Sequence, residues 1–298
     1  MSTINFDFEK HHFQGELPES LDNPITITLQ TTRLCNLHCI YCSEDQLLSE
    51  PSKGELEDII DQIKDVKRVI VSGGEPLLRK DAFDLLGRLK DQEHIVALAT
   101  NGTRINKEVA GRLVGLVDYV DLTIDGPRKI HNMIRGNYDK IMEGILNLRE
   151  QGVEYSIVTV LVPQNLDYLE DICQVVDTLG GRKQKILTPI PKGRGKEIYK
   201  KTKGKYLLDE VFDRLKTGKE TKSWSQRITL TDWRRIGEGH ALLIHPDGNV
   251  VASPIFSGEE AVEYIGNLHK ESLGQLWDKF QHKEEHFKKY LEKSLYVC

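Results

Sequence analysis

Strand-like and helix-like patterns alternate along most of this 298-residue chain. Segments that alternate β-branched and polar residues, beginning with "PITITLQTT" (24–32), are separated by stretches whose apolar residues recur at helical spacing, such as "DAFDLLGRLKD" (81–91). Six such units follow one another and end near residue 190. Because parallel strands need crossover connections, which helices supply, the pattern predicts an α/β fold built on one parallel sheet.

The segments of unusual composition all come directly after predicted strands. "CNLHCIYC" (35–42) and "SGGEP" (72–76) follow the first two strands, and "TNGT" (100–103) and "DGPRKIHNMIRG" (125–136) follow the third and fourth. Barrels and open parallel sheets build their sites at the carboxyl ends of their strands. The sequence therefore predicts one site at that end of the sheet.

Three of the five cysteines, Cys35, Cys39 and Cys42, lie within eight positions. An odd cysteine count with such clustering is a poor disulfide framework and is more typical of metal binding. A closed structural zinc site takes four ligands, which His38 would have to complete here. Three thiolates alone fit a four-iron cubane in which one iron remains free to bind a small molecule.

The C-x-x-x-C-x-x-C spacing, with an aromatic residue before the last cysteine, resembles the radical S-adenosylmethionine (SAM) superfamily. The "SGGEP", "TNGT" and "DGPRKIHNMIRG" segments continue the resemblance in the right order, over roughly residues 24–195. It implies a partial (β/α)6 TIM-like barrel that holds one [4Fe–4S] cluster on Cys35, Cys39 and Cys42. It also implies that SAM, bound by the free iron, is cleaved reductively to a 5′-deoxyadenosyl radical that removes hydrogen from a substrate.

The resemblance extends to residues that would contact SAM. Gly73 and Gly74 permit close approach of the backbone, and Glu75 is an acceptor suited to the ammonium group of SAM. Tyr41 would lie over the adenine, and Arg135 would bind the methionyl carboxylate as guanidinium groups do. The alternatives are an ordinary turn for "SGGEP" and a solvent-exposed arginine.

Three further candidates come at or just after the ends of the third and fourth strands. Asn101, Thr123 and Asp125 are expected to hydrogen-bond the ribose of SAM or the substrate. Asn-Gly and Asp-Gly also make turns without any ligand, which is the alternative interpretation. His131 is expected either to orient Asp125 or to pack.

The pattern changes near residue 192. "PKGRGKEIYKKTKGK" (191–205) is rich in Lys and Gly and is predicted to be a solvated loop or linker, with a substrate-phosphate contact as the alternative. A helix is predicted at 207–218, and "RITLTDW" (227–233) with "HALLIHPDGNVVASPIF" (240–256) predicts a hairpin unit. An amphipathic helix is predicted at 271–294.

These elements divide the chain into an N-terminal polar segment (1–23), a barrel (24–195) and a small C-terminal α+β extension (196–298). The extension resembles the SPASM or twitch units that carry auxiliary clusters in some relatives. Their cysteines would fall at Arg235 or Ile236 and at Ala252 or Ser253, so we expect the extension to have kept its fold without the metal.

The remaining two cysteines have simpler expectations. Cys173 lies on the apolar stripe of a predicted helix and is predicted to be core. Cys298 is the last residue of the sequence and is interpreted as an inert thiol, with a remnant of a lost ligand set or a hydrogen-atom donor as weaker alternatives.

Charge and hydropathy limit the partners. The formal net charge of -5 and the pI near 6.1 give no general attraction to nucleic acid or anionic lipid, and no apolar run would span a bilayer. The first residues lack the features of a signal peptide, so a cytoplasmic protein is expected. An electron donor such as flavodoxin or ferredoxin would reduce the cluster.

Two substrate classes compete. A small molecule such as a sugar, a nucleotide or a cofactor precursor is favoured by the missing auxiliary cluster. A ribosomally made peptide, epimerised or cross-linked by the protein, is the alternative, and the N-terminal segment is too short for an added leader-binding domain. A non-catalytic iron–sulfur or zinc scaffold would explain the cysteines but not "SGGEP".

Overall fold

The computed structural model describes residues 5–8, 12–15, 21–44, 50–181, 183–202, 208–231, 241–252, 263–280 and 295–297. The helices of these residues are α1 (Lys53–Gln62), α2 (Ala82–Asp91), α3 (Lys107–Leu113), α4 (Arg128–Ile134), α5 (Tyr138–Glu150), α6 (Leu169–Leu179), α7 (Gly195–Thr202), α8 (Leu208–Lys222) and α9 (Leu273–Lys279), with 3-10 turns η1 (Pro76–Leu78) and η2 (Leu166–Tyr168). The strands are β1 (Asn5–Asp7), β2 (His12–Gln14), β3 (Thr26–Gln30), β4 (Arg68–Ser72), β5 (Ile95–Ala99), β6 (Tyr119–Thr123), β7 (Tyr155–Val160), β8 (Lys183–Leu187), β9 (Arg227–Thr231), β10 (Ala241–Ile244), β11 (Asn249–Ala252), β12 (Glu263–Asn267) and β13 (Leu295–Val297).

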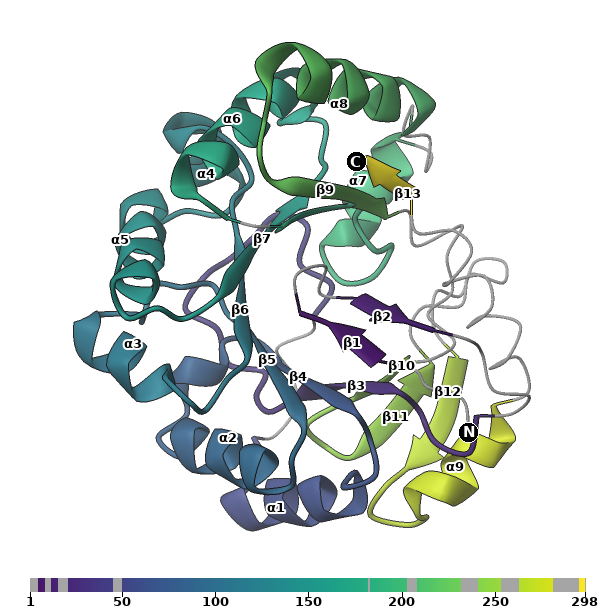
Figure 1. The fold of residues 1–298 in the computed structure, drawn as a ribbon. Coiled ribbons are helices and arrows are strands. Elements are labelled where there is room, and N and C mark those ends of the chain that lie inside the picture. Colours follow the sequence, from purple (N-terminus) through teal and green to yellow (C-terminus); the bar gives the residue numbers. More distant parts are fainter. Residues whose placement is uncertain are drawn as a thin grey trace.

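Strands β3 to β8 lie side by side in chain order, each parallel to the next. The sheet curves, and the crossover helices cover its outer face (Figure 1). Outward-facing residues such as Ile27, Val69 and Leu122 are fully buried in the main apolar core. The predicted six βα units and the TIM-like partial barrel are confirmed.

Two more strands join this sheet in parallel orientation, one at each edge. β9 pairs with β8, and β10 pairs with β3. The predicted hairpin with its turn at "PDGN" is present. The inclusion of 227–233 in that unit is wrong, because α8 acts as a further crossover that returns β9 to the barrel edge. The antiparallel hairpin at "HPDGN" joins β10 to β11 alone.

The N-terminal polar segment contains a short hairpin, β1–β2, that lies in the space enclosed by the curved sheet (Figure 1). Phe6 stacks on the ring of Tyr119 with 6.2 Å between centroids, and Phe13 is fully buried. The guanidinium of Arg68 lies 5.2 Å from the ring centroid of Phe6 and 4.9 Å from that of Phe13. The hairpin thus packs against the first residues of β4 and β6, the end opposite to the predicted site.

The C-terminal helix is shorter than predicted. α9 begins at a capping box on Ser272 and ends at Lys279, and Phe280 has extended backbone. The side chains of Trp277 and Phe280 are buried in the main core with 5.7 Å between ring centroids, so burial of Phe280 competes with continuation of the helix. The rest of the predicted helix, 281–294, lies outside the described residues.

Two segments for which the sequence predicted no helix are helical. α4 occupies most of "DGPRKIHNMIRG", and α7 occupies the segment predicted as a linker. Both bury isoleucines in one small apolar cluster. Ile130, Ile134 and Ile198 belong to it, and Ile40 and Tyr41 pack against it. Each helix has too few apolar residues to show a helical period, so the packing of this cluster was not visible in the sequence.

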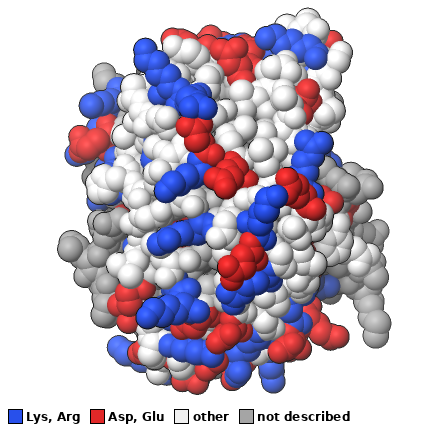
Figure 2. All heavy atoms as spheres, turned by 90° about the vertical axis from the view of Figure 1, so that its left-hand side faces the viewer, with Lys and Arg blue, Asp and Glu red and all other residues white. Residues whose placement is uncertain are grey.

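The outer helical face in Figure 2 carries Lys and Arg interspersed with Asp and Glu. Within the part of the chain that the structure describes, no helix has the length and apolarity needed to cross a bilayer.

Candidate functional site

The cysteine loop (35–42) follows β3 at the carboxyl end of the parallel strands. Cys39 is buried, whereas Cys35 and Cys42 are partly exposed. The N–H of Cys42 donates to the carbonyl of Cys39 (3.2 Å), and the N–H of Leu37 donates to the Cys35 sulfur (3.4 Å). Burial raises the pKa of the Cys35 and Cys39 thiols, and the positive charge of Arg135 opposes this in both.

The three cysteine side chains suit an iron–sulfur cluster better than a single metal ion. No three Cys, His, Asp or Glu side chains of the described residues converge as ligands of one ion, and His38 is exposed. A four-iron cubane does not require such convergence, because each thiolate binds a different iron. Cys35, Cys39 and Cys42 are free thiols in one loop, and the negative charge of Cys42 raises the pKa of both other thiols, which indicates that the three lie near one another.

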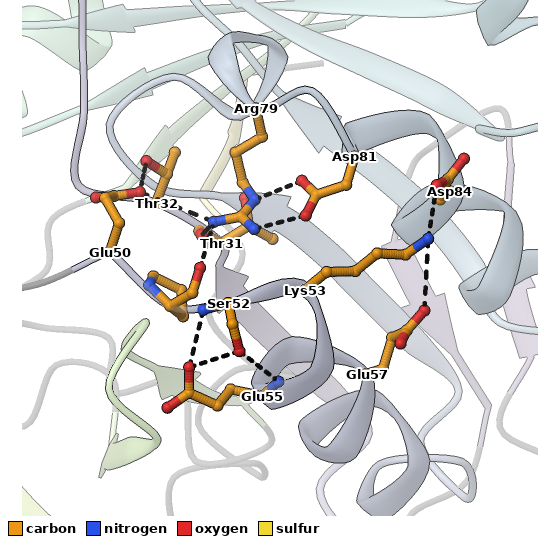
Figure 3. A network of polar contacts seen from close by, with 11 residues as sticks. Thr31, Thr32, Glu50, Ser52, Lys53, Glu55, Glu57, Arg79, Asp81 and Asp84 are labelled. Atoms are coloured by element: carbon orange, nitrogen blue, oxygen red, sulfur yellow. Dashed lines mark hydrogen bonds and ion pairs between the residues drawn. The ribbon is translucent and has the colours of Figure 1, made fainter.

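A polar network fixes the start of the cysteine loop (Figure 3). The Nη1 group of Arg79 donates to the carbonyls of Thr31 (3.2 Å) and Pro51 (3.0 Å). Glu50 accepts from the backbone N–H of Arg33 at 2.8 Å. These contacts join the end of β3 to the residues before α1, so the loop leaves the sheet in a defined direction.

The two glycines of "SGGEP" lie directly against the cysteine loop. The N–H of Gly74 donates to the Thr32 carbonyl (2.7 Å), and the N–H of Glu75 donates to the Leu34 carbonyl (2.7 Å). A Cβ on Gly73 would lie 2.4 Å from the Thr32 oxygen, and one on Gly74 would lie 2.2 Å from the Leu34 oxygen. The close backbone approach expected for these glycines is therefore made to residues 32–34, which lead from β3 into the cysteine loop.

Glu75 is fully buried and joins "SGGEP" to "TNGT". Its carboxylate accepts from the Thr100 hydroxyl (2.7 Å), from the N–H of Asn101 (2.7 Å) and from the N–H of Leu77 (3.1 Å). Burial raises the pKa of Glu75, and these three donors lower it. A carboxylate offers about four acceptor positions, so Glu75 keeps capacity for one more donor.

Asn101 and Thr123 lie in the same region. The amide of Asn101 donates to Asn36 (2.9 Å) and is 3.9 Å from the Cys35 sulfur. Its carbonyl oxygen accepts from the N–H of Thr103 (2.9 Å), so the predicted turn is also present. Thr123 ends β6 and pairs in register with Val158.

Tyr41, Asp125 and Arg135 form one chain of contacts. The Tyr41 hydroxyl donates to Asp125 Oδ2 (2.6 Å), and Arg135 Nη1 donates to the Tyr41 hydroxyl (2.6 Å). Burial raises the pKa of both Tyr41 and Asp125, and the positive charge of Arg135 opposes both shifts. The Arg135 side chain is only 12% exposed, so the solvent-exposed alternative is wrong.

His131 acts on the backbone of Asp125. Its Nδ1 accepts from the N–H of Asp125 (3.1 Å), and its ring packs edge-on against Tyr138. Burial, together with the charge of Arg135, lowers the pKa of His131 to about 4, so the ring is neutral and its proton lies on Nε2. Both expectations for His131, orienting Asp125 and packing, are therefore met.

The segment 193–195 holds the other side of the cysteine loop, and the sequence analysis missed it. Arg194 Nε donates to the Cys39 carbonyl (2.8 Å), and the N–H of Arg194 donates to the Cys42 carbonyl (2.8 Å). The prediction of a solvated linker is wrong here. The two glycines that flank Arg194 were the available signal, because they allow the chain to approach another backbone closely.

The structure tests some of the remaining cysteine predictions but not others. Cys173 is buried in a cluster between the sheet, α6 and α8, as predicted, and burial raises the pKa of its thiol to about 12. Ala252 is buried at the end of β11. Arg235, Ile236, Ser253 and Cys298 lie outside the described residues.

The sequence pattern of the family described as "Radical SAM superfamily" matches residues 29–176. That range begins in β3 and includes the cysteine loop, "SGGEP", "TNGT" and α4. The chain carries a radical SAM domain. Members of this superfamily use a [4Fe–4S] cluster and SAM, and the cysteine loop with the polar groups around it fits both.

Relatives of this domain act on different substrates according to their names. Mycofactocin maturase MftC of Mycolicibacterium smegmatis is 31% identical over 195 residues, which cover 62% of this chain and 49% of MftC. AdoMet-dependent heme synthase of Nitratidesulfovibrio vulgaris is 29% identical over 215 residues, which cover 68% of this chain and 58% of the synthase. The chain thus spans about half the length of the curated relatives it matches.

Solved structures support the same fold. Streptococcus suis SuiB bound to precursor peptide SuiA is similar with a TM-score of 0.69 at 16% identity, covering 92% of this chain and 68% of SuiB. The partial barrel and its flanking strands are therefore an arrangement seen in radical SAM proteins.

Proposed function

We propose that this protein is a radical SAM enzyme that cleaves SAM reductively at one [4Fe–4S] cluster held by Cys35, Cys39 and Cys42. The observation that carries the proposal is the convergence of the cysteine loop, Glu75 and the Tyr41–Asp125–Arg135 contacts at one end of the barrel. When bound and reduced by its electron donor, the cluster would supply the electron for cleavage of a carbon–sulfur bond of SAM, and the chemistry so provided would be removal of hydrogen from the substrate by a 5′-deoxyadenosyl radical.

The residues of the chain bind and orient SAM in this proposal. Glu75 uses its remaining acceptor position for the ammonium group, and the Thr100 and Asn101 donors fix the direction of its carboxylate. Arg135 has five N–H donors, of which Nη1 serves Tyr41, and Arg135 Nε has no hydrogen-bond partner among the described residues. The remaining donors suit the methionyl carboxylate of SAM.

Tyr41, Asn101, Thr123 and Asp125 complete the proposed SAM and substrate contacts. The ring of Tyr41 is held by hydrogen bonds of its hydroxyl, which supports the proposal that it packs on the adenine. Gly73 and Gly74 contribute indirectly, because they let "SGGEP" reach the cysteine loop.

We propose a small-molecule substrate such as a sugar, a nucleotide or a cofactor precursor. The similarity to heme synthases, whose products are small molecules, supports this class. A peptide substrate is the second candidate, supported by MftC and by the complex of SuiB with SuiA. A flavodoxin or ferredoxin as electron donor and a cytoplasmic location belong to the same proposal.

The test is anaerobic reconstitution followed by reduction in the presence of SAM. We expect close to four irons and four sulfides per chain, as one cubane requires, and formation of 5′-deoxyadenosine and methionine. Replacement of Cys35, Cys39 and Cys42 by Ala should abolish both, whereas Cys173→Ala, which changes a buried core thiol, should retain the cluster. An iron content near eight, or a cluster that survives the triple replacement, would refute the proposal. SAM cleavage would also separate the enzyme from a non-catalytic scaffold.

A further inference from the structure

The segment Gly193–Gly195, which we call the Arg194 clamp, contacts two of the three cysteine residues through their main chain. The N–H groups of Arg194 (2.8 Å) and Gly195 (3.4 Å) both donate to the carbonyl of Cys42. The guanidinium donates from Nε to the carbonyl of Cys39 at 2.8 Å. One short segment after β8 therefore fixes the peptide groups of the second and third cysteines.

The glycines of the clamp are required by this close approach. Gly193 has φ +54°, and a Cβ there would lie 2.6 Å from the Cys42 carbonyl oxygen. A Cβ on Gly195 would lie 2.3 Å from the Ile190 oxygen and 3.1 Å from the Tyr41 oxygen. α7, which begins at Gly195, buries Ile198 in the small core against which Ile40 and Tyr41 pack. The cysteine loop and the clamp thus form one packed unit.

Arg194 differs from the other cation of the site in its bonding. Arg135 lies near the thiols but shares its charge with Asp125, whose Oδ2 is 4.0 Å from Nη1, and with the Tyr41 hydroxyl. Arg194 donates to a neutral peptide carbonyl of a cysteine residue. A hydrogen bond from a guanidinium polarises that peptide group and brings a full positive charge next to the loop.

We propose that Arg194 is a positioning residue for the iron–sulfur cluster, and that its positive charge favours the reduced state of the cluster. This inference rests on the proposed function, in which Cys35, Cys39 and Cys42 hold the cluster. Net charge, hydrogen bonding and exposure around a cluster set its reduction potential. Reduction adds one negative charge, which a nearby cation stabilises, so loss of the Arg194 charge makes reduction by dithionite less favourable.

Two substitutions separate charge from packing. Arg194→Gln keeps a side-chain donor but removes the charge, and Arg194→Lys keeps the charge but removes the planar guanidinium. Lys196→Gln is the matched control, because Lys196 is an exposed cation two positions along the same chain segment. All three are made in the full-length chain, reconstituted anaerobically, and checked for iron content.

The readout is the ratio of reduced to oxidised cluster at a fixed solution potential, measured by electron paramagnetic resonance. For Arg194→Gln we expect a drop of about tenfold, which is 59 mV for a one-electron couple, because the lost charge is partly buried and close. Lys196→Gln and Arg194→Lys should stay within about twofold of the wild type. A ratio in Arg194→Gln equal to that of Lys196→Gln overturns the inference.

The experiment also gives a clear answer if Arg194→Gln fails to bind the cluster. If Arg194→Gln binds no iron, then Arg194→Lys must hold the cluster with a wild-type ratio for the inference to stand, and failure of Arg194→Lys overturns it. A wild-type protein that forms no cluster refutes the proposed function instead, so the two failures are distinguishable.

Discussion

Two segments hold the cysteine loop from opposite sides. Both use glycines and backbone N–H groups that donate to carbonyls, but their side chains differ. The motif flank, residues 73–75 with 100–101, presents glycines and N–H groups to the carbonyls of Thr32 and Leu34, before the first cysteine. The Arg194 clamp presents glycines and N–H groups to the carbonyl of Cys42. The motif flank adds a buried carboxylate, Glu75, and the clamp adds a guanidinium.

The difference indicates a division of labour between the flanks. The Glu75 carboxylate lies among hydrogen-bond donors and faces the region where we place the ammonium group of SAM. Among the described residues, the Arg194 guanidinium donates only to the Cys39 carbonyl, so its effect passes through the cysteine loop. Side-chain changes at Glu75 should therefore alter SAM binding, whereas side-chain changes at Arg194 should alter the cluster.

The largest effect is expected from steric disruption of either flank. Gly74→Ala places a methyl group 2.2 Å from the Leu34 oxygen, and Gly195→Ala places one 2.3 Å from the Ile190 oxygen. Both clashes are with backbone, so we expect each variant to lose most of its iron and about 1–3 kcal/mol of unfolding free energy. Iron content and urea unfolding measure the two losses.

The matched control for these glycines is Gly54→Ala in the first turn of α1. A Cβ there has no atom within 4 Å, so this change should be neutral or slightly stabilising. Full iron content in Gly74→Ala together with loss in Gly195→Ala would show that the clamp alone holds the loop.

Glu75→Gln is expected to weaken SAM binding by about thirtyfold while the cluster remains. The neutral amide replaces a charged acceptor, and hydrogen bonds to charged groups contribute roughly 1.5–3 kcal/mol. Isothermal titration of the reconstituted protein with SAM measures the change, and Glu55→Gln in the exposed capping box of α1 is the control. A variant that binds SAM normally but loses its cluster would assign Glu75 to the cysteine loop instead.

Tyr41→Phe tests the contact that joins the two charged residues of the site. The change keeps the ring but removes the hydroxyl that bridges Asp125 and Arg135, so Arg135 loses one of its fixed positions. We expect roughly tenfold weaker SAM binding with unchanged iron content, from the loss of hydrogen bonds to charged groups. Tyr168→Phe removes a hydroxyl from a half-exposed tyrosine away from the loop and should have no effect. Equal SAM binding in both variants would mean that the hydroxyl has no part in orienting Arg135.

The six βα units were predictable because each contains an alternating strand pattern followed by apolar residues at helical spacing. α1 starts after Ser52, whose capping box with Glu55 agrees with the helical period that follows. The edges were not predictable in the same way, because a strand pattern such as that of β9 does not say which partner it pairs with. The placement of β9 beside β8 depends on α8 serving as a crossover, which only the packed structure reveals.

The candidate site likewise has a part that the sequence predicts and a part that it does not. Cys35, Glu75, Asn101 and Arg135 come in a fixed order after successive strands, so the topology brings them to one end of the barrel. The side-chain contacts within the site join residues that are far apart in the sequence, and no local pattern predicts such contacts. Tyr41 and Asp125 are 84 positions apart, and Arg194 and Cys39 are 155 positions apart. The second pair was missed because a Lys- and Gly-rich segment has no period that would mark it as packed.

The smallest expected effect concerns the pH dependence of stability, and it comes from His131 beside Asp125. His131 is buried and supports the backbone of Asp125, and burial lowers its pKa to about 4 from an ordinary value near 6.5. Between these values the unfolded chain binds a proton that the folded chain does not, so the stability associated with His131 is present above pH 6.5 and is lost as the pH falls.

For the apo protein we expect this residue to account for about 1 kcal/mol of the decrease in unfolding free energy between pH 6.5 and 5.5. His131→Asn keeps an acceptor for the Asp125 N–H and should remove that share, which the unfolding free energies at the two pH values measure. Identical pH dependence in His131→Asn and the wild type would show that folding does not lower the pKa of His131.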